Sequence, residues 1–322
     1  MTHAVSSTLA IHGGAGTIRR EEMTPDREAS YHAGLRRALA AGHRVLSAGG
    51  DAIDAVVEAV KVLEDDPLFN AGRGAVFNID GEQEMDAAVM DGRDRSAGAI
   101  AGICGPRHPV LAARAVMERC EPVFLAGPGA RAFCREVGLE HCEPEWFVTE
   151  RRLAALDEER ARRRAGRPDE RDEESRHGTV GAVACDRNGH LAAATSTGGM
   201  TGKASGRVGD APVIGAGTWA DDATCAVSAT GHGEVFIRYA AAHEIDARMR
   251  WGGQTLEAAA RAVVDDVLAP VGGSGGVVAV DNSGRVALPF NSAGMYRGYV
   301  GVDGLLHTAI HREDFRVEKM DQ

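Results

Sequence analysis

A densely charged segment near the middle of the chain separates two stretches of different character. Between Arg151 and Arg176, 17 of 26 residues are charged, nine of them arginine and eight of them acidic. A segment of this composition has too little apolar surface for a core of its own, and it is typical of a solvated linker or an exposed charged helix. A further hypothesis is that it joins two halves that need not stay joined.

The stretch before this linker predicts a mixture of strands and helices. Its apolar residues recur at helical spacing or in short strand-like runs, and Asp51 is a candidate N-cap for the helix that follows it. The expected strands lie at 8–11, 85–90, 97–104 and 123–125, and the expected helices at 25–46, 52–63, 109–119 and 130–137.

The stretch after the linker is dominated by strand-like runs, interrupted by one helical region. Strands are expected at 179–185, 191–197, 213–220, 225–230, 276–280, 285–288, 295–300 and 306–310, and helices at 233–250 and 256–267. Several strands on each side of two helical groups predict two stacked sheets covered by helices. This is an α+β fold with four layers in the order αββα.

Composition excludes several classes of function. The net charge of −11 argues against a nucleic-acid or anionic-membrane surface, because phosphate binding needs clustered lysine and arginine. The chain has no run of about 18 apolar residues and no signal-like start. Six widely spaced cysteines without a C-x-x-C pair favour reduced thiols over disulfides. We therefore expect a cytoplasmic protein.

The 41 glycines invite a nucleotide-binding interpretation, which the motifs do not support. A P-loop fails because Ala204 follows Gly202-Lys203 and the first glycine is missing. The segment 215–220 fits a loose dinucleotide pattern, but a strand follows it and not the helix that would hold a pyrophosphate. The 12 histidines form no metal-binding motif. No cofactor is therefore expected for the chemistry.

Threonine–glycine pairs recur between residues 177 and 234, in the motifs HGTVG, TSTGGMTGK, GRVGD and SATGHGE. Any one of these threonines fits ordinary strand or turn chemistry. Three of them at strand ends, together with Arg207 and Asp210, would converge if the strands are neighbours. A zwitterionic amino acid needs one cation and one anion, and Arg207 with Asp210 supplies both, although such a pair is also typical of a surface ion pair.

A threonine hydroxyl is a weak nucleophile and needs a base. The α-amino group of Thr179 would serve if the chain breaks between Gly178 and Thr179, because its pKa of about 7.7–8.0 suits a general base. The break would follow the charged segment directly, and glycine tolerates the strained backbone that favours attack on the preceding carbonyl.

These motifs, together with AIHGGAGTI and LEDDPLFNAGRGAVFN, resemble the plant-type asparaginase and isoaspartyl peptidase family of N-terminal-nucleophile hydrolases. The resemblance covers nearly the whole chain. It implies an αββα sandwich that cuts itself into an α subunit, 1–178, with the linker at about 151–178, and a β subunit, 179–322. The two form one catalytic domain, and an (αβ)₂ homodimer is expected.

The resemblance also implies roles for individual residues. Thr179 would be the nucleophile, Thr197 would orient it, and the Thr230 hydroxyl with the Gly231 N–H would form the oxyanion hole. Arg207 would bind the α-carboxylate of the substrate, and Asp210 with the Gly233 carbonyl would bind its α-ammonium group. Asn70 would lie near the nucleophile. A structural sodium ion is implied on the backbone carbonyls of Leu63, Glu64, Asp66, Phe69, Ala71 and Arg73.

The expected activity is hydrolysis of the β-amide of asparagine and of β-aspartyl dipeptides through an acyl-enzyme on Thr179. A glycosylasparaginase shares the GRVGD and GAG motifs, but the absence of a signal peptide counts against it. A non-catalytic amino-acid-binding scaffold is a second alternative, disfavoured because every catalytic position is intact. Two departures from the family pattern, Ala211 and Gly202, are expected to reshape the pocket beyond the β-carbonyl.

Overall fold

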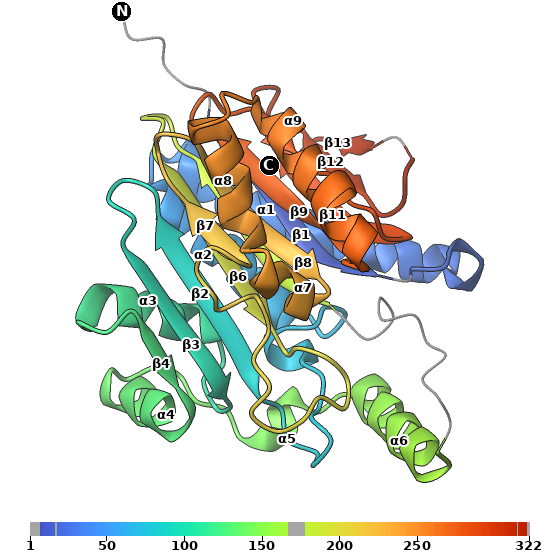
Figure 1. The fold of residues 1–322 in the computed structure, drawn as a ribbon. Helices are drawn as coiled ribbons and strands as arrows, with labels where there is room; N and C mark the ends of the chain where they lie inside the picture. Colours follow the sequence, from blue (N-terminus) through green and yellow to red (C-terminus); the bar gives the residue numbers. More distant parts are fainter. Residues whose placement is uncertain (1–6, 17, 167–177, 314, 321–322) are drawn as a thin grey trace, which may run out of the picture.

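Two β-sheets pack face to face, and each is covered by helices on its outer side (Figure 1). The computed structural model describes residues 7–16, 18–166, 178–313 and 315–320. The larger sheet has the strand order β13-β12-β11-β1-β5-β6-β2-β3-β4, and the smaller has the order β10-β9-β8-β7. The predicted αββα sandwich is therefore confirmed.

The larger sheet is antiparallel except for the parallel pair β3–β4. Its strands are β1 (Thr8–Gly16), β2 (Met85–Asp91), β3 (Ala97–Ile103), β4 (Phe124–Ala126), β5 (Val180–Cys185), β6 (Leu191–Thr197), β11 (Gly294–Val300), β12 (Leu306–Ala309) and β13 (Arg316–Glu318). The smaller sheet consists of β7 (Thr218–Ala220), β8 (Cys225–Gly231), β9 (Gly275–Asp281) and β10 (Val286–Ala287).

The helices divide between the two outer faces. The larger sheet is covered by α1 (Pro25–Ser47), α2 (Ala52–Asp65) and α3 (Pro109–Arg119), with α4 (Gly127–Glu136) beside β3 and β4. The smaller is covered by α7 (Gly233–Arg238), α8 (Ala241–Arg250) and α9 (Leu256–Arg261). The short α5 (Pro144–Phe147) and the longer α6 (Glu150–Arg164) precede the second half of the chain. Among the described residues, no helix combines the length and apolar character needed to cross a membrane.

Three apolar layers hold the sandwich together. Leu35, Leu39 and Val56 pack from α1 and α2 onto the larger sheet, and Phe236 packs from α7 onto the smaller. The layer between the sheets contains small fully buried residues, such as Ala10, Ala193 and Ala226. Small residues let the sheets approach closely, so strand ends from both sheets can reach one site.

The two halves of the chain interleave in the larger sheet. β5 and β6, which follow the charged segment, lie between β1 and β2, which precede it. A cut before Thr179 would therefore leave two fragments sharing one sheet. Since β5 begins after Thr179 and the antiparallel β6 ends at Thr197, both threonines lie at the same end of the sandwich.

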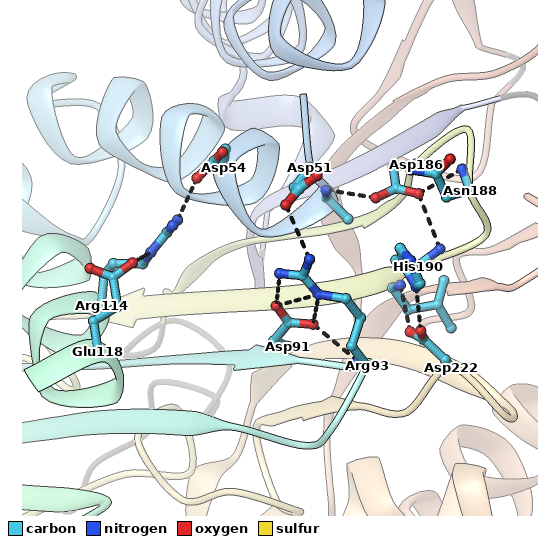
Figure 2. Close-up of polar contacts among 12 residues, drawn as sticks. Asp51, Asp54, Asp91, Arg93, Arg114, Glu118, Asp186, Asn188, His190 and Asp222 are labelled. Atoms are coloured by element: carbon cyan, nitrogen blue, oxygen red, sulfur yellow. Dashed lines mark hydrogen bonds and ion pairs between the residues drawn. The ribbon is translucent and has the colours of Figure 1, made fainter. Parts of the chain in front are cut away.

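At the opposite end, carboxylates close the turns (Figure 2). Asp186 Oδ1 accepts the N–H of Asn188 (2.8 Å) and of His190 (3.1 Å) in the turn between β5 and β6. The His190 ring contacts Asp222 across to the smaller sheet, with 2.7 Å between Nδ1 and Oδ2. These bonds fix the register of the central strands, and with it the positions of their other ends.

The start of α2 uses the same network. Asp51 occupies the predicted N-cap position, but its side chain makes no capping bond and pairs with Arg93 at 3.1 Å. The N–H of Ala52 donates to Asp186 Oδ2 instead, at 3.3 Å. The buried N–H at this helix start, which has no partner within the helix, is thus satisfied from a distant turn.

Three predicted elements differ from those observed. The helix expected at 233–250 is two helices, because Ala240 adopts a left-handed backbone with φ of 46°. The strand expected at 213–220 forms only as β7, because the N–H groups of Ala216 and Gly217 turn back to the Val213 carbonyl. The helix expected at 256–267 is α-helical to Arg261 and then π-helical over Ala262–Leu268.

The charged segment is ordered in its first part, where α6 forms, whereas 167–177 lie outside the described residues. The alternative of a charged helix therefore fits 150–164 better than a solvated linker. It is not fully exposed, because Leu156 and Glu159 are buried.

Packing of α3 on β3 generates a testable prediction. A Cβ at Gly98 would lie 2.2 Å from the Ala113 carbonyl oxygen and 2.4 Å from Met117 N, both of them backbone atoms. We expect Gly98→Ala to destabilise the protein by about 1–3 kcal/mol, because the helix must move away. Gly129→Ala is the matched control. Its added methyl group lies at an exposed position of α4 and meets no atom within 4 Å. The change should therefore stabilise the protein by about 0.5–1 kcal/mol. Urea unfolding measures both, and equal effects would contradict this packing.

Candidate active site

The Gly178 carbonyl oxygen is held by two side-chain donors. The Thr197 hydroxyl donates to it at 2.8 Å, and the Asn70 amide donates to it at 2.8 Å. Thr197 comes from the end of β6, and Asn70 comes from the loop after α2. Two donors on one carbonyl polarise it and would stabilise negative charge on its oxygen.

The Thr197 hydroxyl also contacts the hydroxyl of Thr179. Thr179 Oγ1 donates to Thr197 Oγ1 at 3.2 Å, and the Gly199 N–H donates to the same oxygen at 2.9 Å. One hydroxyl therefore touches both the predicted nucleophile and the carbonyl of the predicted cleavage bond. Thr179 and Thr197 are buried, at 5% and 3% exposure.

The loop that carries Asn70 is fastened to the same turn. Asn70 Nδ2 also donates to the Gly199 carbonyl at 2.7 Å, and Asn70 Oδ1 accepts the N–H of Val76 at 3.0 Å. The Asn70 carbonyl accepts the Gly198 N–H at 3.1 Å. Every polar group of this side chain is thus used to hold Gly178 and its surroundings in place.

The backbone of β1 passes directly against the predicted cleavage bond. A Cβ at Gly14, where φ is 110°, would lie 3.2 Å from Gly178 Cα and 3.3 Å from Thr179 N. Glycine meets both the backbone geometry and the close approach. The glycine segment 13–16 of β1 therefore forms one wall of the site.

His12 is a site residue that the sequence analysis missed. Its Nδ1–H donates to the Thr179 carbonyl at 3.0 Å, and its Nε2 accepts the Ser228 hydroxyl at 2.9 Å. Because a carbonyl only accepts, Nδ1 carries the proton of the neutral ring. Burial lowers the His12 pKa to about 3, against a smaller raising effect of the Thr179 hydrogen bond. His12 stays neutral and fixes the Thr179 backbone.

A chain of hydroxyls continues from His12 between the two sheets. Ser228 on β8 contacts Thr195 on β6 at 2.7 Å, and Thr218 Oγ1 on β7 lies 2.7 Å from Thr195 Oγ1. The motif AIHGG is the one local sequence feature that could have identified His12, because its hydrogen-bond partners lie up to 216 residues away in sequence.

Thr230 and Gly231, the predicted oxyanion hole, lie at the end of β8 beside β1. Thr230 Oγ1 accepts the Ala15 N–H at 3.1 Å, one residue from the Gly14 wall. Gly231 has φ of 149°, and a Cβ there would lie 2.2 Å from the Ser274 carbonyl oxygen. The structure thus brings Thr230 and Gly231 to the strand segment that touches Thr179.

Arg207, Asp210 and Gly233 form a second cluster. A Cβ at Gly233 would lie 2.8 Å from Asp210 Oδ1 and 3.0 Å from Arg207 Nη2. The cluster adjoins the Thr197 turn, since a Cβ at Gly199 would lie 3.4 Å from Arg207 Nη1. Arg207 pairs with Glu234 through Nε at 2.9 Å. A cation and an anion therefore face the same glycine.

The Asp210 carboxyl is buried, and among the described residues its Oδ2 has no hydrogen-bond partner. Desolvation raises the Asp210 pKa to about 7, opposed by a backbone hydrogen bond and by Arg207. A ligand ammonium beside Oδ2 would favour the ionised form.

The two departures from the family pattern lie at different places. Ala211 is fully buried, and its carbonyl accepts the Thr218 hydroxyl at 2.9 Å. Gly202 has φ of 70°, and a Cβ there would lie 2.6 Å from Glu159 Cγ on α6. Gly202 therefore faces the charged helix.

In the loop after α2, the backbone carbonyls of Leu63 and Glu64 lack their usual helical N–H partners. Pro67 has no N–H for the Leu63 carbonyl, and the Leu68 N–H donates to Asp66 Oδ1 at 3.0 Å and not to Glu64. The loop then folds back, since a Cβ at Gly72 would lie 2.4 Å from the Glu64 carbonyl oxygen.

The remaining predicted carbonyls, those of Asp66, Phe69, Ala71 and Arg73, belong to the same loop. Those of Asp66 and Ala71 accept the N–H groups of Phe69 and Gly74. A Cβ at Gly74 would lie 1.9 Å from the Phe69 oxygen. Such a carbonyl-lined loop fits a hard cation. The described residues contain no metal-binding group of three or more His, Cys, Asp or Glu side chains.

A threonine that precedes a central strand of an αββα sandwich, with its hydroxyl bonded to a second threonine that also polarises the preceding carbonyl, is typical of the N-terminal-nucleophile hydrolases. Comparison with known proteins agrees. The model of the asparaginase family matches residues 5–310, and the chain belongs to that family.

Curated relatives extend over almost the whole chain. Over 312 residues it is 50% identical to the isoaspartyl peptidase of Salmonella typhimurium, covering 95% of this chain and 99% of that protein. It is also 50% identical to the Escherichia coli isoaspartyl peptidase, covering 95% and 97%. The human isoaspartyl peptidase/L-asparaginase is 41% identical over 307 residues, covering 95% and 96%.

The raised pKa of Asp210 predicts a pH-dependent stability. The folded protein binds this proton more tightly than the unfolded chain does, so stability decreases as the pH rises from about 4 to about 7. We expect Asp210→Asn to be more stable than wild type at pH 8, by roughly 2–4 kcal/mol, with the difference vanishing near pH 4. Urea unfolding at the two pH values checks this. A constant difference would show that Asp210 ionisation is not responsible.

Proposed function

We propose that the chain cuts its own Gly178–Thr179 bond and then hydrolyses the β-amide of L-asparagine and the β-aspartyl bond of isoaspartyl dipeptides. The observation that carries the proposal is the Thr197 hydroxyl, which contacts both the Thr179 hydroxyl and the Gly178 carbonyl. The names of the relatives, isoaspartyl peptidase and isoaspartyl peptidase/L-asparaginase, support the substrate class.

In self-cleavage, Thr179 Oγ1 would attack the Gly178 carbonyl carbon. The oxyanion that forms would remain hydrogen-bonded to Thr197 and Asn70, the two donors already on that oxygen. The C–N bond then breaks, the hydroxyl proton passes to the nitrogen, and an ester joins Gly178 to Thr179. Water hydrolyses the ester, leaving a carboxylate on Gly178 and a free α-amine on Thr179. The products are 1–178 and 179–322.

In turnover, the new α-amine of Thr179 would act as the general base. It accepts the Thr179 hydroxyl proton while Oγ1 attacks the substrate β-carbonyl, and it returns a proton to the leaving ammonia or amino acid. The Thr230 hydroxyl and the Gly231 N–H would hold the oxyanion. Water then hydrolyses the aspartyl ester on Thr179 and releases aspartate. His12 has no proton-transfer role in this scheme, because burial keeps it neutral.

Substrate orientation would come from the charged cluster. Arg207 would bind the α-carboxylate with its planar fork, which its bond to Glu234 pre-orients. Asp210 and the Gly233 carbonyl would bind the α-ammonium. Placing both charges on one side leaves the β-carbonyl to point towards Thr179. Because Asp210 must be ionised for this, affinity should weaken below about pH 7.

A sodium ion would be held by the carbonyls of Leu63, Glu64, Asp66, Phe69, Ala71 and Arg73. Its contribution would be structural, since it would neutralise converging carbonyl dipoles in the loop that carries Asn70. We also propose an (αβ)₂ assembly of processed protomers and a cytoplasmic location. The assembly rests on the family resemblance described above, and the location rests on the six widely spaced cysteines, which favour reduced thiols.

Self-cleavage is tested on a denaturing gel with intact mass. We expect purified wild type to convert to two fragments, Thr179→Ala to stay full length, and Thr179→Ser to cleave because it keeps a hydroxyl. A wild type that stays intact after prolonged incubation would contradict the mechanism, as would a Thr179→Ala that cleaves normally.

Substrate class is tested with β-aspartyl-leucine, asparagine and a glycosylated asparagine. We expect processed wild type to hydrolyse the first two, with at least a thousandfold loss in any Thr179→Ala preparation, since the nucleophile is removed. Preferential hydrolysis of the glycosylated substrate would support glycosylasparaginase instead. Binding without hydrolysis of any of the three would support the amino-acid-binding scaffold.

A further inference from the structure

The helix α6, formed by the first part of the charged segment, lies against two loops of the candidate site (Figure 1). One loop, 66–79, carries Asn70. The other, 198–203, follows the Thr197 strand. The helix starts at a capped position, since Thr149 Oγ1 accepts the Arg152 N–H at 3.3 Å. Several of its contacts with the loops are hydrogen bonds from arginine side chains, which hydrophobic periodicity does not reveal.

Besides Arg151, whose Nη1 donates to Leu68 O at 3.5 Å, three arginines of α6 donate to backbone carbonyls of these loops. Arg152 Nε donates to Gly74 O at 2.7 Å, and Arg160 donates to Ile79 O at 3.0 Å from Nε and 2.8 Å from Nη2. Arg163 Nη2 donates to Gly202 O at 2.7 Å. Hydrogen bonds from charged donors are the stronger kind, and these three span the length of the helix.

A buried glutamate holds the last of these arginines. Glu159 is 1% exposed, and its Oε1 accepts Arg163 Nε at 2.6 Å and Arg162 Nη2 at 2.8 Å. The Glu159 methylene group also fills the space where a side chain at Gly202 would lie. Glycine at 202, a departure from the family pattern, therefore makes room for this Glu–Arg pair.

Gly202 connects α6 with the reacting groups through one short turn. The Gly202 N–H donates to Phe77 O at 2.8 Å, which joins the two loops. Three residues earlier, the Gly199 N–H donates to Thr197 Oγ1 at 2.9 Å, and the Gly199 carbonyl accepts Asn70 Nδ2 at 2.7 Å. A shift of this turn would move both donors of the Gly178 carbonyl together.

We propose that α6 is a clamp that stays bound to the two loops after self-cleavage, and that Arg163 is a positioning residue for the turn that orients Thr197. The inference rests on the proposed function. It assigns to the charged segment a role in turnover as well as in joining the two halves. Arg163 touches no reacting atom, so its effect should fall on the rate and not on substrate affinity.

The test compares Arg163→Ala with Arg164→Ala in the processed enzyme. Arg164 is exposed in the same last turn of α6, so its replacement removes an equal charge and length. For Arg163→Ala we expect kcat for β-aspartyl-leucine and the rate of self-cleavage to fall about tenfold, with KM within twofold of wild type. Arg164→Ala should match wild type, and Arg163→Lys should recover part of the rate.

A second pair of measurements keeps the proposal testable if Arg163→Ala folds poorly. Gly202→Ala places a methyl group against the Glu159 side chain and should lower kcat as Arg163→Ala does. Amide hydrogens of 154–164 should exchange equally slowly before and after self-cleavage in wild type. Equal kcat for Arg163→Ala and Arg164→Ala, or loss of protection after cleavage, would overturn the clamp. A wild type that neither cleaves nor hydrolyses would instead contradict the proposed function.

Discussion

The Gly178 carbonyl oxygen, bonded at once to Thr197 and Asn70, is the contact on which the rest of the site depends. The same Thr197 oxygen accepts the Thr179 hydroxyl, so the predicted nucleophile and the Gly178 carbonyl are both hydrogen-bonded to one side chain. Asn70 extends the arrangement to the loop after α2. Catalytic geometry needs tolerances of about half an ångström, which single flexible side chains do not provide. Here the Thr197 and Asn70 side chains each make three hydrogen bonds.

The four-layer sandwich explains how such a contact is maintained. β5 and β6 are central strands of the larger sheet, with neighbours from the first half of the chain on both sides. Carboxylates fix their turn at one end, and Thr179 and Thr197 lie at the other. The His12–Ser228 bond then ties the larger sheet to the smaller, which supplies Thr230. A cut at 178–179 would free one terminus while the interleaved sheet keeps both fragments together.

The sequence predicted the layers, most strands and the residues that converge, because strand alternation and the threonine–glycine motifs are local signals. It missed His12, whose partners Thr179 and Ser228 are 167 and 216 residues away. It also missed the packing of α6 against the two loops of the site. A highly charged segment is usually interpreted as solvated, whereas its arginines can also donate to buried backbone carbonyls. The break at Ala240 depends on a left-handed backbone that alanine rarely adopts, so no propensity predicts it.

We propose that Thr179 becomes an N-terminal nucleophile when the Gly178–Thr179 bond is cut. The most direct measurement is the N-terminal sequence and mass of the smaller fragment from freshly purified protein. We expect a single fragment that begins Thr179-Val180-Gly181 and carries an unmodified α-amine, with Gly178 as the last residue of its partner. A fragment that begins at any other residue, or a blocked Thr179 amine in active protein, would contradict it.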